Sequence, residues 1–389
     1  MLYENCTTLL LGLKDIAVTN FDEEENYLIV DIISLKETKH CPHCGCKTHA
    51  HGYRWQPVKD LAFRGKTVIL RLKKKRYICV GCGKTFFEKP EFLPRYHRMT
   101  RRLYQSIIRE MRKNYSMKSV AQQHDVSPNT VSRIFDIVNY SLNKMPSVLS
   151  IDEFKGNAGR EKYQCILADP QRKKVLDILR SREKSCLIDY FLSFKDRKRV
   201  KFLIMDMWKP YKDLSWLFPD ATVIVDKFHY TRQVYWALDR VRKRVQKLFV
   251  DQKRKYFKRS KKLLFAPFKS LLEESKAALN LMLTQHDDLF VAWQLKELFL
   301  DFKYCGNAEE GKKVLRQWIL TVQNTSLSEF KDCITAFLNW FIPIVNSLDC
   351  PYTNGFVEGT NNKIKVLKRN AYGYRNFNRF RNRILHCCA

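Results

Sequence analysis

The sequence predicts an α/β core that is interrupted by a long all-α region and preceded by two small domains. Residues 147–229 alternate between short apolar runs rich in β-branched residues and amphipathic stretches, as the strands and helices of one α/β domain do. Residues 230–345 carry Leu, Phe and Trp at helical spacing instead. Two C-x-x-C pairs lie upstream of both regions. The 389 residues leave room for two or three domains.

The charge of the chain predicts a polyanionic partner. Lys and Arg number 71 against 40 Asp and Glu, which gives a net charge of +31 and a field that attracts nucleic acid. A merely solvated basic surface is the alternative. No run approaches the roughly 20 apolar residues of a membrane span, and no basic segment precedes the short apolar run near the start. We therefore expect a cytoplasmic protein, no membrane partner, and 13 cysteines that act as metal ligands or buried thiols.

The first predicted domain, residues 1–98, contains the cysteine pairs. CPHCG and CVGCG each form a tight knuckle, and four thiolates complete a closed tetrahedral Zn²⁺ site, so nearby histidines are not needed. The expected ligands of this one structural Zn²⁺ are Cys41, Cys44, Cys79 and Cys82. The segment TVILRLKKKRYI between the pairs alternates as a strand does and would present Arg71, Lys73 and Lys75 on one face. The sequence thus predicts a zinc ribbon, and four unligated thiols are the alternative.

Residues 99–146 predict a helix-turn-helix domain. Three short helical patterns follow one another, the first opening at Thr100 and the third at Ser127, which precedes a proline at the first helical position. Val131, Ile134 and Phe135 should pack inward. The outward residues near the start of the third helix would then meet DNA, and these are Asn129, Thr130, Ser132 and Arg133. A plain three-helix bundle is the alternative.

Residues 147–229 predict the first part of the α/β core. The runs VLSIDEF, YQCILADP and KKVLDILRSR read as strands and are followed by a helix, the strand VKFLIMDMW, a second helix and the strand ATVIVDKFH. This order is that of a ribonuclease-H-like fold, in which the first and fourth strands are neighbours. Asp152 and Asp206 should therefore meet across adjacent strands. Asp226 and His229, at the end of the fifth strand, are expected to orient the site by a hydrogen bond or to contact the scissile phosphate; an ordinary structural Asp/His pair is the alternative.

Residues 230–345 predict a helical insertion domain. Its aromatic residues, including Trp293, Phe299 and Trp318, are expected to form a core rather than a surface on which bases stack. The basic stretch from Arg240 to Lys262 could either contact DNA or be solvated.

Residues 346–389 predict the last part of the core, with a basic tail. Glu358 opens a helical segment, where the helix dipole supports a carboxylate; a solvated helix cap is the alternative. Cations follow in the same segment and would hold the DNA backbone: Lys363, Lys365, Lys368 and Arg369. Nearby amides could contact DNA or orient Glu358, and these are Asn354, Asn361 and Asn362. Asp152, Asp206 and Glu358 together offer hard oxygen ligands of the kind that a pair of Mg²⁺ ions requires for phosphoryl transfer.

The order of these parts resembles the bacterial insertion-sequence transposases of the ISL3 type. The resemblance runs from about Cys41 to Arg383 and is carried by CPHCG with CVGCGKTFFE, SIDEF, MDMWKPY, DKFHY and NGFVEGTNNKIKVLKRNAYGYRNF. It implies that Asp152, Asp206 and Glu358 form a DDE triad that binds two Mg²⁺ or Mn²⁺ ions. It also implies a nucleoid-associated protein that assembles on double-stranded DNA, both transposon ends and target, as a homodimer or a larger complex.

The reaction implied by the resemblance is hydrolysis at the transposon end, followed by attack of the freed 3′-hydroxyl on target DNA. The zinc ribbon and the helix-turn-helix would recognise the terminal inverted repeats. A catalytically silent DNA-binding regulator derived from such an enzyme is the main alternative, and a structure-selective nuclease is a third.

Overall fold

The computed structural model describes residues 11–259 and 261–388, so the first ten residues of the predicted zinc-ribbon domain and residue 389 lie outside the described residues. The chain forms two compact units. The first unit takes in the chain up to Asn139 together with residues 366–373 and 382–387, and the second unit takes in the remainder.

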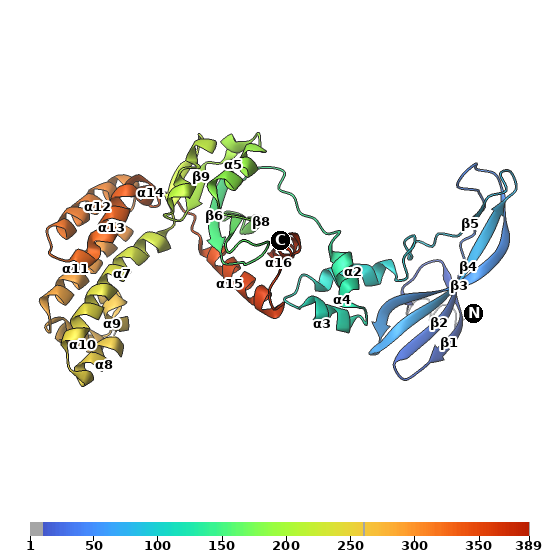
Figure 1. The fold of residues 1–389 in the computed structure, drawn as a ribbon, viewed down its shortest axis with the longest axis horizontal. Helices are drawn as coiled ribbons and strands as arrows, with labels where there is room; N and C mark the ends of the chain where they lie inside the picture. Colours follow the sequence, from blue (N-terminus) through green and yellow to red (C-terminus); the bar gives the residue numbers. More distant parts are fainter. Residues whose placement is uncertain (1–10, 260, 389) are drawn as a thin grey trace. The chain divides into compact units, whose positions relative to one another are not determined.

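A five-stranded sheet dominates the first unit (Figure 1). The strands are β1 (Ile16–Glu23), β2 (Tyr27–Ser34), β3 (Thr48–Phe63), β4 (Lys66–Cys79) and β5 (Thr85–Phe87). Their order is β1-β2-β4-β3, with β5 also paired to β4, and β2 and β4 run parallel. β4 contains the predicted strand TVILRLKKKRYI and forms a long hairpin with the 16-residue β3. Arg64 and Gly65 close it with positive φ angles of 49° and 78°, a conformation that suits the twist of a two-residue turn.

Three helices follow the sheet, as predicted: α2 (Arg101–Glu110), α3 (Met117–Gln123) and α4 (Pro128–Phe135). Each begins after a hydroxyl residue whose side chain accepts a hydrogen bond from a backbone N–H in the first turn. Their core contains Leu103, Ile107, Val120, Val131 and Phe135, all buried. The third helix ends at Phe135, earlier than its sequence pattern suggests.

The C-terminal helix α16 (Phe377–Cys388) contributes residues 382–387 to this first unit, although we assigned residues 346–389 to the core. Arg383 is fully buried and donates to the carbonyls of Met111, Lys113 and Tyr115, while His386 contacts the Ile108 carbonyl at 2.7 Å. These contacts satisfy the carbonyls of Ile108 and Met111 at the end of α2 and those of Lys113 and Tyr115 in the connection to α3. The helix-turn-helix core is therefore completed by a segment far away in sequence.

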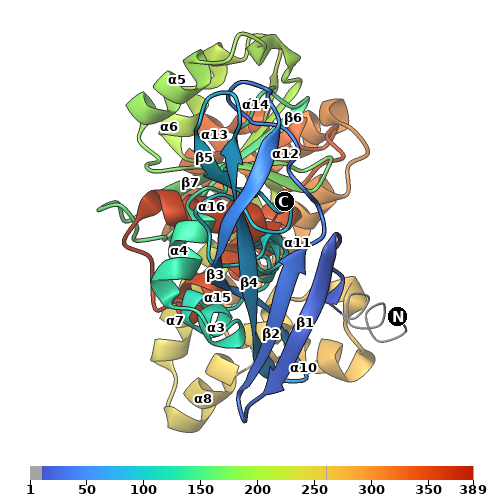
Figure 2. The same ribbon diagram turned by 90° about the vertical axis from the view of Figure 1, so that its right-hand side faces the viewer.

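The second unit contains a mixed sheet that agrees with the predicted strand order. It consists of β6 (Val148–Phe154), β7 (Gln164–Asp169), β8 (Lys174–Leu179), β9 (Phe202–Met205) and β10 (Thr222–Val225). The strand order is β10-β9-β6-β7-β8, in which β6, β9 and β10 run parallel and β7 is antiparallel to both β6 and β8. The predicted neighbours, the first and fourth strands, are confirmed as β6 and β9. Helices α5 (Lys184–Leu192) and α6 (Lys209–Lys212) lie between the strands in sequence. Figure 2 shows α5 and α6 in a second view, with β6 and β7 of the sheet.

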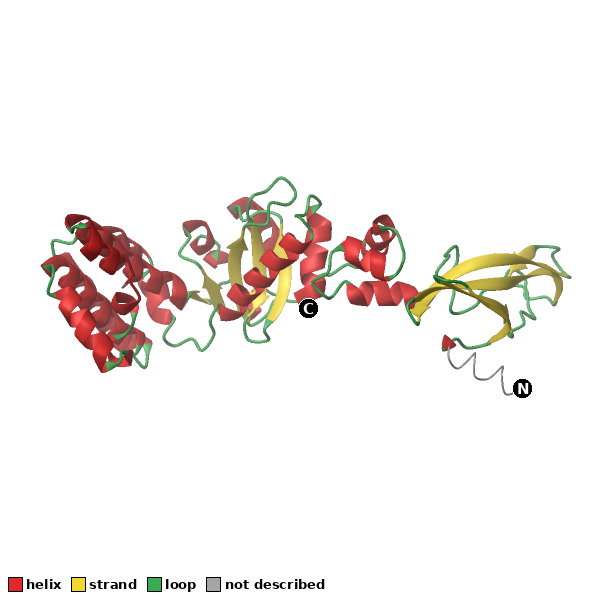
Figure 3. Ribbon diagram, turned by 90° about the horizontal axis from the view of Figure 1, so that it is seen from below, coloured by secondary structure: helices red, strands yellow, loops and turns green. Residues whose placement is uncertain are grey.

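The described residues between Lys227 and Asn346 form helices and loops without a strand, as Figure 3 shows by its colouring. The α-helices are α7 (Lys227–Val245), α8 (Asp251–Arg259), α9 (Lys261–Phe265), α10 (Glu273–Leu283), α11 (Asp287–Lys303), α12 (Ala308–Gln323), α13 (Lys331–Asn339) and α14 (Phe341–Asn346). Phe299 and Trp318 are buried and Trp293 packs against the same core, so the predicted aromatic core is confirmed. Among the helices of the described residues, none combines the length and the apolar character needed to cross a membrane.

Candidate active site and zinc centre

The register of the parallel strands brings two predicted carboxylates to one edge of the sheet. Ile151 of β6 pairs with Met205 of β9, so Asp152 and Asp206 follow at equivalent positions on neighbouring strands. β9 ends at Met205 while β6 continues to Phe154, and Asp152 therefore lies where β6 extends beyond its neighbour. The expectation that these two residues meet across adjacent strands is confirmed.

Asp152 is a buried acid whose protonation equilibrium is strongly shifted. Burial, and next the negative charge of Asp206, raise the pKa of Asp152 to about 7, although the Glu153 N–H and His229 oppose this shift. Its Oδ1 accepts from the Glu153 N–H at 2.7 Å, and its Oδ2 accepts from Asn361 Nδ2 at 3.0 Å. A buried carboxylate that lies beside a second negative charge favours the binding of a proton or a metal cation.

Asp226 and His229 extend this cluster along the sheet edge. Val225 pairs with Met205, and Asp226 follows as the residue before α7. His229, in the first turn of α7, places Nε2 2.6 Å from Asp206 Oδ1 and 3.9 Å from Asp226 Oδ2. Burial alone would lower the pKa of His229, but the hydrogen bond and charge of Asp206, together with Asp226, outweigh burial and raise it. His229 is therefore placed to fix the orientation of the Asp206 carboxylate.

Helix α15 (Gly355–Asn370) is tied to the same edge through two asparagines. Asn354, just before the helix, is buried; its backbone N–H donates to Asp226 Oδ1 at 3.3 Å, and its Oδ1 accepts from the Ser150 hydroxyl. Asn361, within the helix, donates to Asp152. Our assignment of site residues omitted Ser150 and left both asparagines as possible helpers. The signal for Ser150 was its position two residues before Asp152, on the same side of a strand.

Glu358 lies in the first turn of α15, one turn before Asn361, with an exposed side chain. The structure does not gather it with the two aspartates. A group of three or more His, Cys, Asp or Glu side chains could hold a metal if their ligand atoms lie within 4.8 Å of one another. Within residues 11–259 and 261–388, the group that meets this condition consists of four cysteines. Asp152, Asp206 and Glu358 form no such group, so the triad remains a prediction.

The four predicted cysteines do converge. Cys41, Cys44, Cys79 and Cys82 have sulfur atoms within 4.8 Å of one another. The backbone N–H groups of His43 and Cys82 point at the Cys41 and Cys79 sulfurs, each at 3.4 Å. A hydrogen bond from the Cys82 backbone lowers the pKa of Cys79 to about 6, which favours the thiolate that binds zinc. Four sulfur donors in two knuckles suit a structural tetrahedral Zn²⁺.

The four helix-turn-helix residues that we expected on the outside differ in their exposure. Asn129 and Arg133 are exposed, and Thr130 is half-buried with its hydroxyl 2.9 Å from that of Ser127. Ser132 is only 7% exposed, so the expectation that it faces DNA is wrong. The short helix turns Ser132 toward the domain core, beside the buried Val131, and away from solvent.

The predicted cations of β4 and α15 lie at or near the surface. Lys73 Nζ is 4.1 Å from the centre of the exposed Tyr53 ring, whereas Arg71 is ion-paired with Asp31. Lys75 is half-buried. On α15, Lys363, Lys365 and Arg369 are exposed and Lys368 is half-buried.

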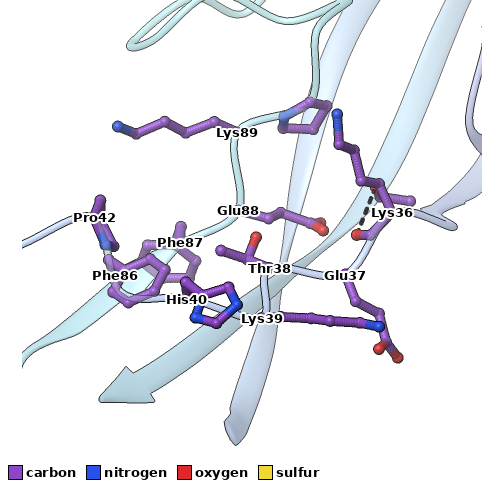
Figure 4. Close-up of a pocket in the computed structure, with 12 residues that line it drawn as sticks. Lys36, Glu37, Thr38, Lys39, His40, Pro42, Phe86, Phe87, Glu88 and Lys89 are labelled. Carbon is purple, nitrogen blue, oxygen red and sulfur yellow. Dashed lines mark hydrogen bonds between the residues drawn. The ribbon is translucent and has the colours of Figure 1, made fainter. Parts of the chain in front are cut away.

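Two hollows in the first unit adjoin the hairpin of β3 and β4. The larger, about 1070 Å³, is lined by the exposed aromatics Trp55 and Tyr96 and is strongly basic. Its cations are Arg54, Lys74, Lys89, Arg95, Arg98 and Arg101, against the acids Glu88 and Glu91. The smaller, about 340 Å³, is shown in Figure 4, with Lys36, Lys39 and Lys89 around it. Glu88 borders both hollows, and burial raises its pKa.

Comparison with known proteins agrees with this arrangement. Residues 149–384 match the DDE-type ISL3 family described as transposase, residues 88–137 match the helix-turn-helix domain of transposase family ISL3, and residues 37–82 match the zinc-finger of transposases IS204, IS1001, IS1096 and IS1165. The transposase of insertion sequence IS1001 from Bordetella parapertussis is 25% identical over 350 residues, which cover 86% of this chain and 85% of that protein.

Two further relatives match over shorter stretches. The transposase of IS1557 from Mycobacterium tuberculosis H37Rv is 31% identical over 105 residues, 27% of this chain and 23% of that protein. A Lactococcus lactis protein named ATP-dependent protease is 42% identical over 90 residues, 23% of this chain and 28% of its own length. Because the transposase match at residues 149–384 spans more than half of the sequence and the two N-terminal matches complete the domain order, the chain belongs to the ISL3 family of DNA transposases.

Proposed function

We propose that this chain binds the terminal inverted repeats of its insertion sequence and catalyses Mg²⁺-dependent DNA strand cleavage and strand transfer. The observation that carries the proposal is the pair Asp152 and Asp206 on adjacent parallel strands, contacted by Asn361 from the helix that bears Glu358. A buried carboxylate with a raised pKa, as Asp152 has beside Asp206, is typical of a functional site.

The core would be ribonuclease-H-like. The order β10-β9-β6-β7-β8, with three antiparallel strands joined to two parallel ones, supports this assignment. We accordingly divide the chain into a zinc-ribbon region (1–98), a helix-turn-helix domain (99–146), two parts of the core (147–229 and 346–389) and a helical insertion (230–345).

Asp152, Asp206 and Glu358 would hold two Mg²⁺ ions, and the hard oxygen donors and the crowded negative charge of the two aspartates fit such ions. When bound, a metal pair activates the attacking oxygen and stabilises the leaving one in an in-line displacement at phosphorus. His229 would fix the Asp206 carboxylate, Asp226 would hold the start of α15 through Asn354, and Asn361 would orient Asp152. Glu358, exposed in the first turn, would turn toward the aspartates when DNA is bound.

The first unit would recognise the DNA ends. The exposed Asn129 and Arg133 at the third helix, with Thr130 beside them, would read bases, while Lys73, Lys75 and the basic hollow beside Trp55 would bind phosphates. The cations of α15 would hold the strand near the carboxylates. Two ends must be joined in one reaction, so we expect a homodimer or a larger assembly on DNA.

The test is an assay with labelled inverted-repeat DNA and Mg²⁺. Joined products that disappear with Asp152→Asn, while end binding persists, support the proposal. Bound but uncut DNA from the unmodified protein would support a silent regulator instead, and cutting that depends on branch structure would support a nuclease. Glu358→Gln tests the third ligand and should behave as Asp152→Asn does.

A further inference from the structure

One face of α7 carries two exposed aromatic residues with an arginine between them. Phe228, Arg232 and Trp236 are four residues apart, so they lie along the same side of the helix. Phe228 is 50% exposed and Trp236 is 46% exposed. We call these three residues the α7 stripe. Large aromatic surfaces left in water at regular spacing indicate a binding surface rather than a core.

The three side chains form a continuous stack. The guanidinium carbon of Arg232 lies 5.2 Å from the centre of the Phe228 ring and 4.6 Å from that of the Trp236 ring. A planar cation between two rings is a cation–π arrangement that holds all three groups in place. The stripe therefore offers flat π surfaces together with a fixed positive charge.

The stripe is continuous with the carboxylate cluster. Arg232 Nη2 lies 3.1 Å from His229 Nδ1, and the other ring nitrogen of His229 contacts Asp206. The Phe228 and His229 rings are 5.5 Å apart and nearly perpendicular. One chain of contacts thus runs from Asp206 through His229 to the stripe, and a DNA strand bound at the aspartates would reach the stripe within its next nucleotides.

We propose that the α7 stripe binds an unpaired base of the DNA strand next to the scissile phosphate, an inference that rests on the proposed function. Every base has a π face that stacks on an aromatic ring, and the adjacent Arg232 charge suits the neighbouring phosphate. The first turn of α7 contains no acidic residue that would repel the strand. An apolar protein partner fits less well, because it would bury the guanidinium at the centre of the stripe without a counter-charge.

The role of such a contact follows from duplex geometry. A phosphate within a paired and stacked duplex is less accessible to a recessed carboxylate cluster than one beside a base that has left the stack. Removing a base from the stack has an energetic cost, which stacking on Phe228 or Trp236 would offset. The α7 stripe would therefore hold the strand in the opened form, and its residues would position the substrate without touching the reacting atoms.

The test uses transposon-end DNA with 5-iodouracil at one position at a time on either side of the cleavage site. Light cross-links this base to an aromatic side chain stacked on it, and peptide mapping identifies that side chain. We expect cross-links to Phe228 or Trp236 at one nucleotide beside the scissile phosphate. Trp216→Ala serves as a matched control, because Trp216 is an exposed tryptophan on the 3-10 helix Ser215–Leu217, in the connection that leads back to the start of β10.

The double variant Phe228→Ala/Trp236→Ala should lower strand joining on fully paired ends by on the order of tenfold or more, the worth of a lost base stack. A mispair at the cross-linked position should restore most of that loss. Arg232→Lys should act in the same direction, because it keeps the charge and loses the planar surface.

Cleavage is measured in the same samples as cross-linking, so a failure of the stripe proposal can be distinguished from a failure of the proposed function. Metal-dependent cleavage without any cross-link to α7 would overturn the stripe proposal and leave the proposed function standing. Cross-links to α7 without cleavage would support the stripe and count against catalysis. A double variant that cleaves normally but no longer assembles into a larger complex would assign the stripe to a second copy of the chain and overturn base binding.

Discussion

In magnesium-free buffer, the Asp152→Asn variant should be more stable than the wild type, and the difference should grow as the pH rises. The same variant should abolish cleavage. Burial, with the nearby charge of Asp206, raises the pKa of Asp152 from about 3.8 to about 7 in the folded state. The folded protein therefore disfavours the ionised carboxylate that the unfolded chain accepts freely. Asn cannot ionise, so the variant should escape this cost.

The size and the pH range follow from the two pKa values. Well below pH 4 the Asp152 carboxyl group is protonated in both the folded and the unfolded state, so its ionisation does not reduce the stability of the wild type. Between pH 4 and 7 the unfolded chain loses its proton first, and the wild type loses stability relative to the variant. At 1.36 kcal/mol for each pH unit the total is on the order of 4 kcal/mol, an upper bound because unfolded chains are not fully solvated.

The local hydrogen bonds can accommodate the amide. Asp152 accepts from the Glu153 N–H and from Asn361 Nδ2, and an asparagine there can keep only one acceptor. Asn361 can compensate by rotating its own amide, because its Oδ1 is buried without a hydrogen-bond partner among the described residues. After rotation, Asn361 Oδ1 would accept from the new amide at position 152.

The assay is urea unfolding in magnesium-free buffer at several pH values, followed by tryptophan fluorescence. Six of the seven tryptophans lie in the second unit, so this signal reports mainly the unit that contains Asp152. Asp189→Asn, an exposed acid on α5, is the matched control and should change little at any pH. A stability difference for Asp152→Asn that is flat with pH, or that favours the wild type above pH 7, would refute the reasoning.

Three further predictions concern the first unit. Cys41→Ser should release zinc and unfold the hairpin end, whereas Cys46→Ser should keep one zinc per chain, as metal analysis and circular dichroism would report. Arg133→Ala should weaken end binding by about 1–3 kcal/mol and reduce the preference for the terminal repeats over unrelated DNA, while Ser132→Ala at a buried position should leave both unchanged in a competition binding assay. Arg383→Met should destabilise the helix-turn-helix by about 3 kcal/mol in thermal unfolding, because it leaves the carbonyls of Met111, Lys113 and Tyr115 without their buried donor.

Local patterns predicted the elements that position the aspartates. Short apolar runs identified β6 to β10, and the known order of such strands placed Asp152 beside Asp206, as the register confirms. The spacing of Asp226 and His229 likewise predicted a contact at the strand end, which His229 makes with Asp206. The cysteine spacing predicted the zinc ligands, because a C-x-x-C knuckle is a local structure.

The missed features depend on contacts between distant segments. The buried position of Ser132 follows from how a short helix packs. The helix has only eight residues, and so short a pattern did not reveal which side of it faces the core. The docking of residues 382–387 onto α2 joins positions roughly 270 apart in sequence, as the Arg383 to Met111 bond does. The parallel pairing of β2 with β4 also joins non-consecutive strands, and periodicity does not specify such partners.

The central claim is that Asp152, Asp206 and Glu358 bind metal together on DNA. The most direct measurement loads Fe²⁺ in place of Mg²⁺ into the complex with transposon-end DNA, adds ascorbate and peroxide, and maps where the protein backbone is cut. The account predicts cuts near residues 152, 206 and 358 that excess Mg²⁺ suppresses and that Asp152→Asn abolishes. Cuts near 152 and 206 without any near 358, on DNA that the protein cleaves, would contradict it.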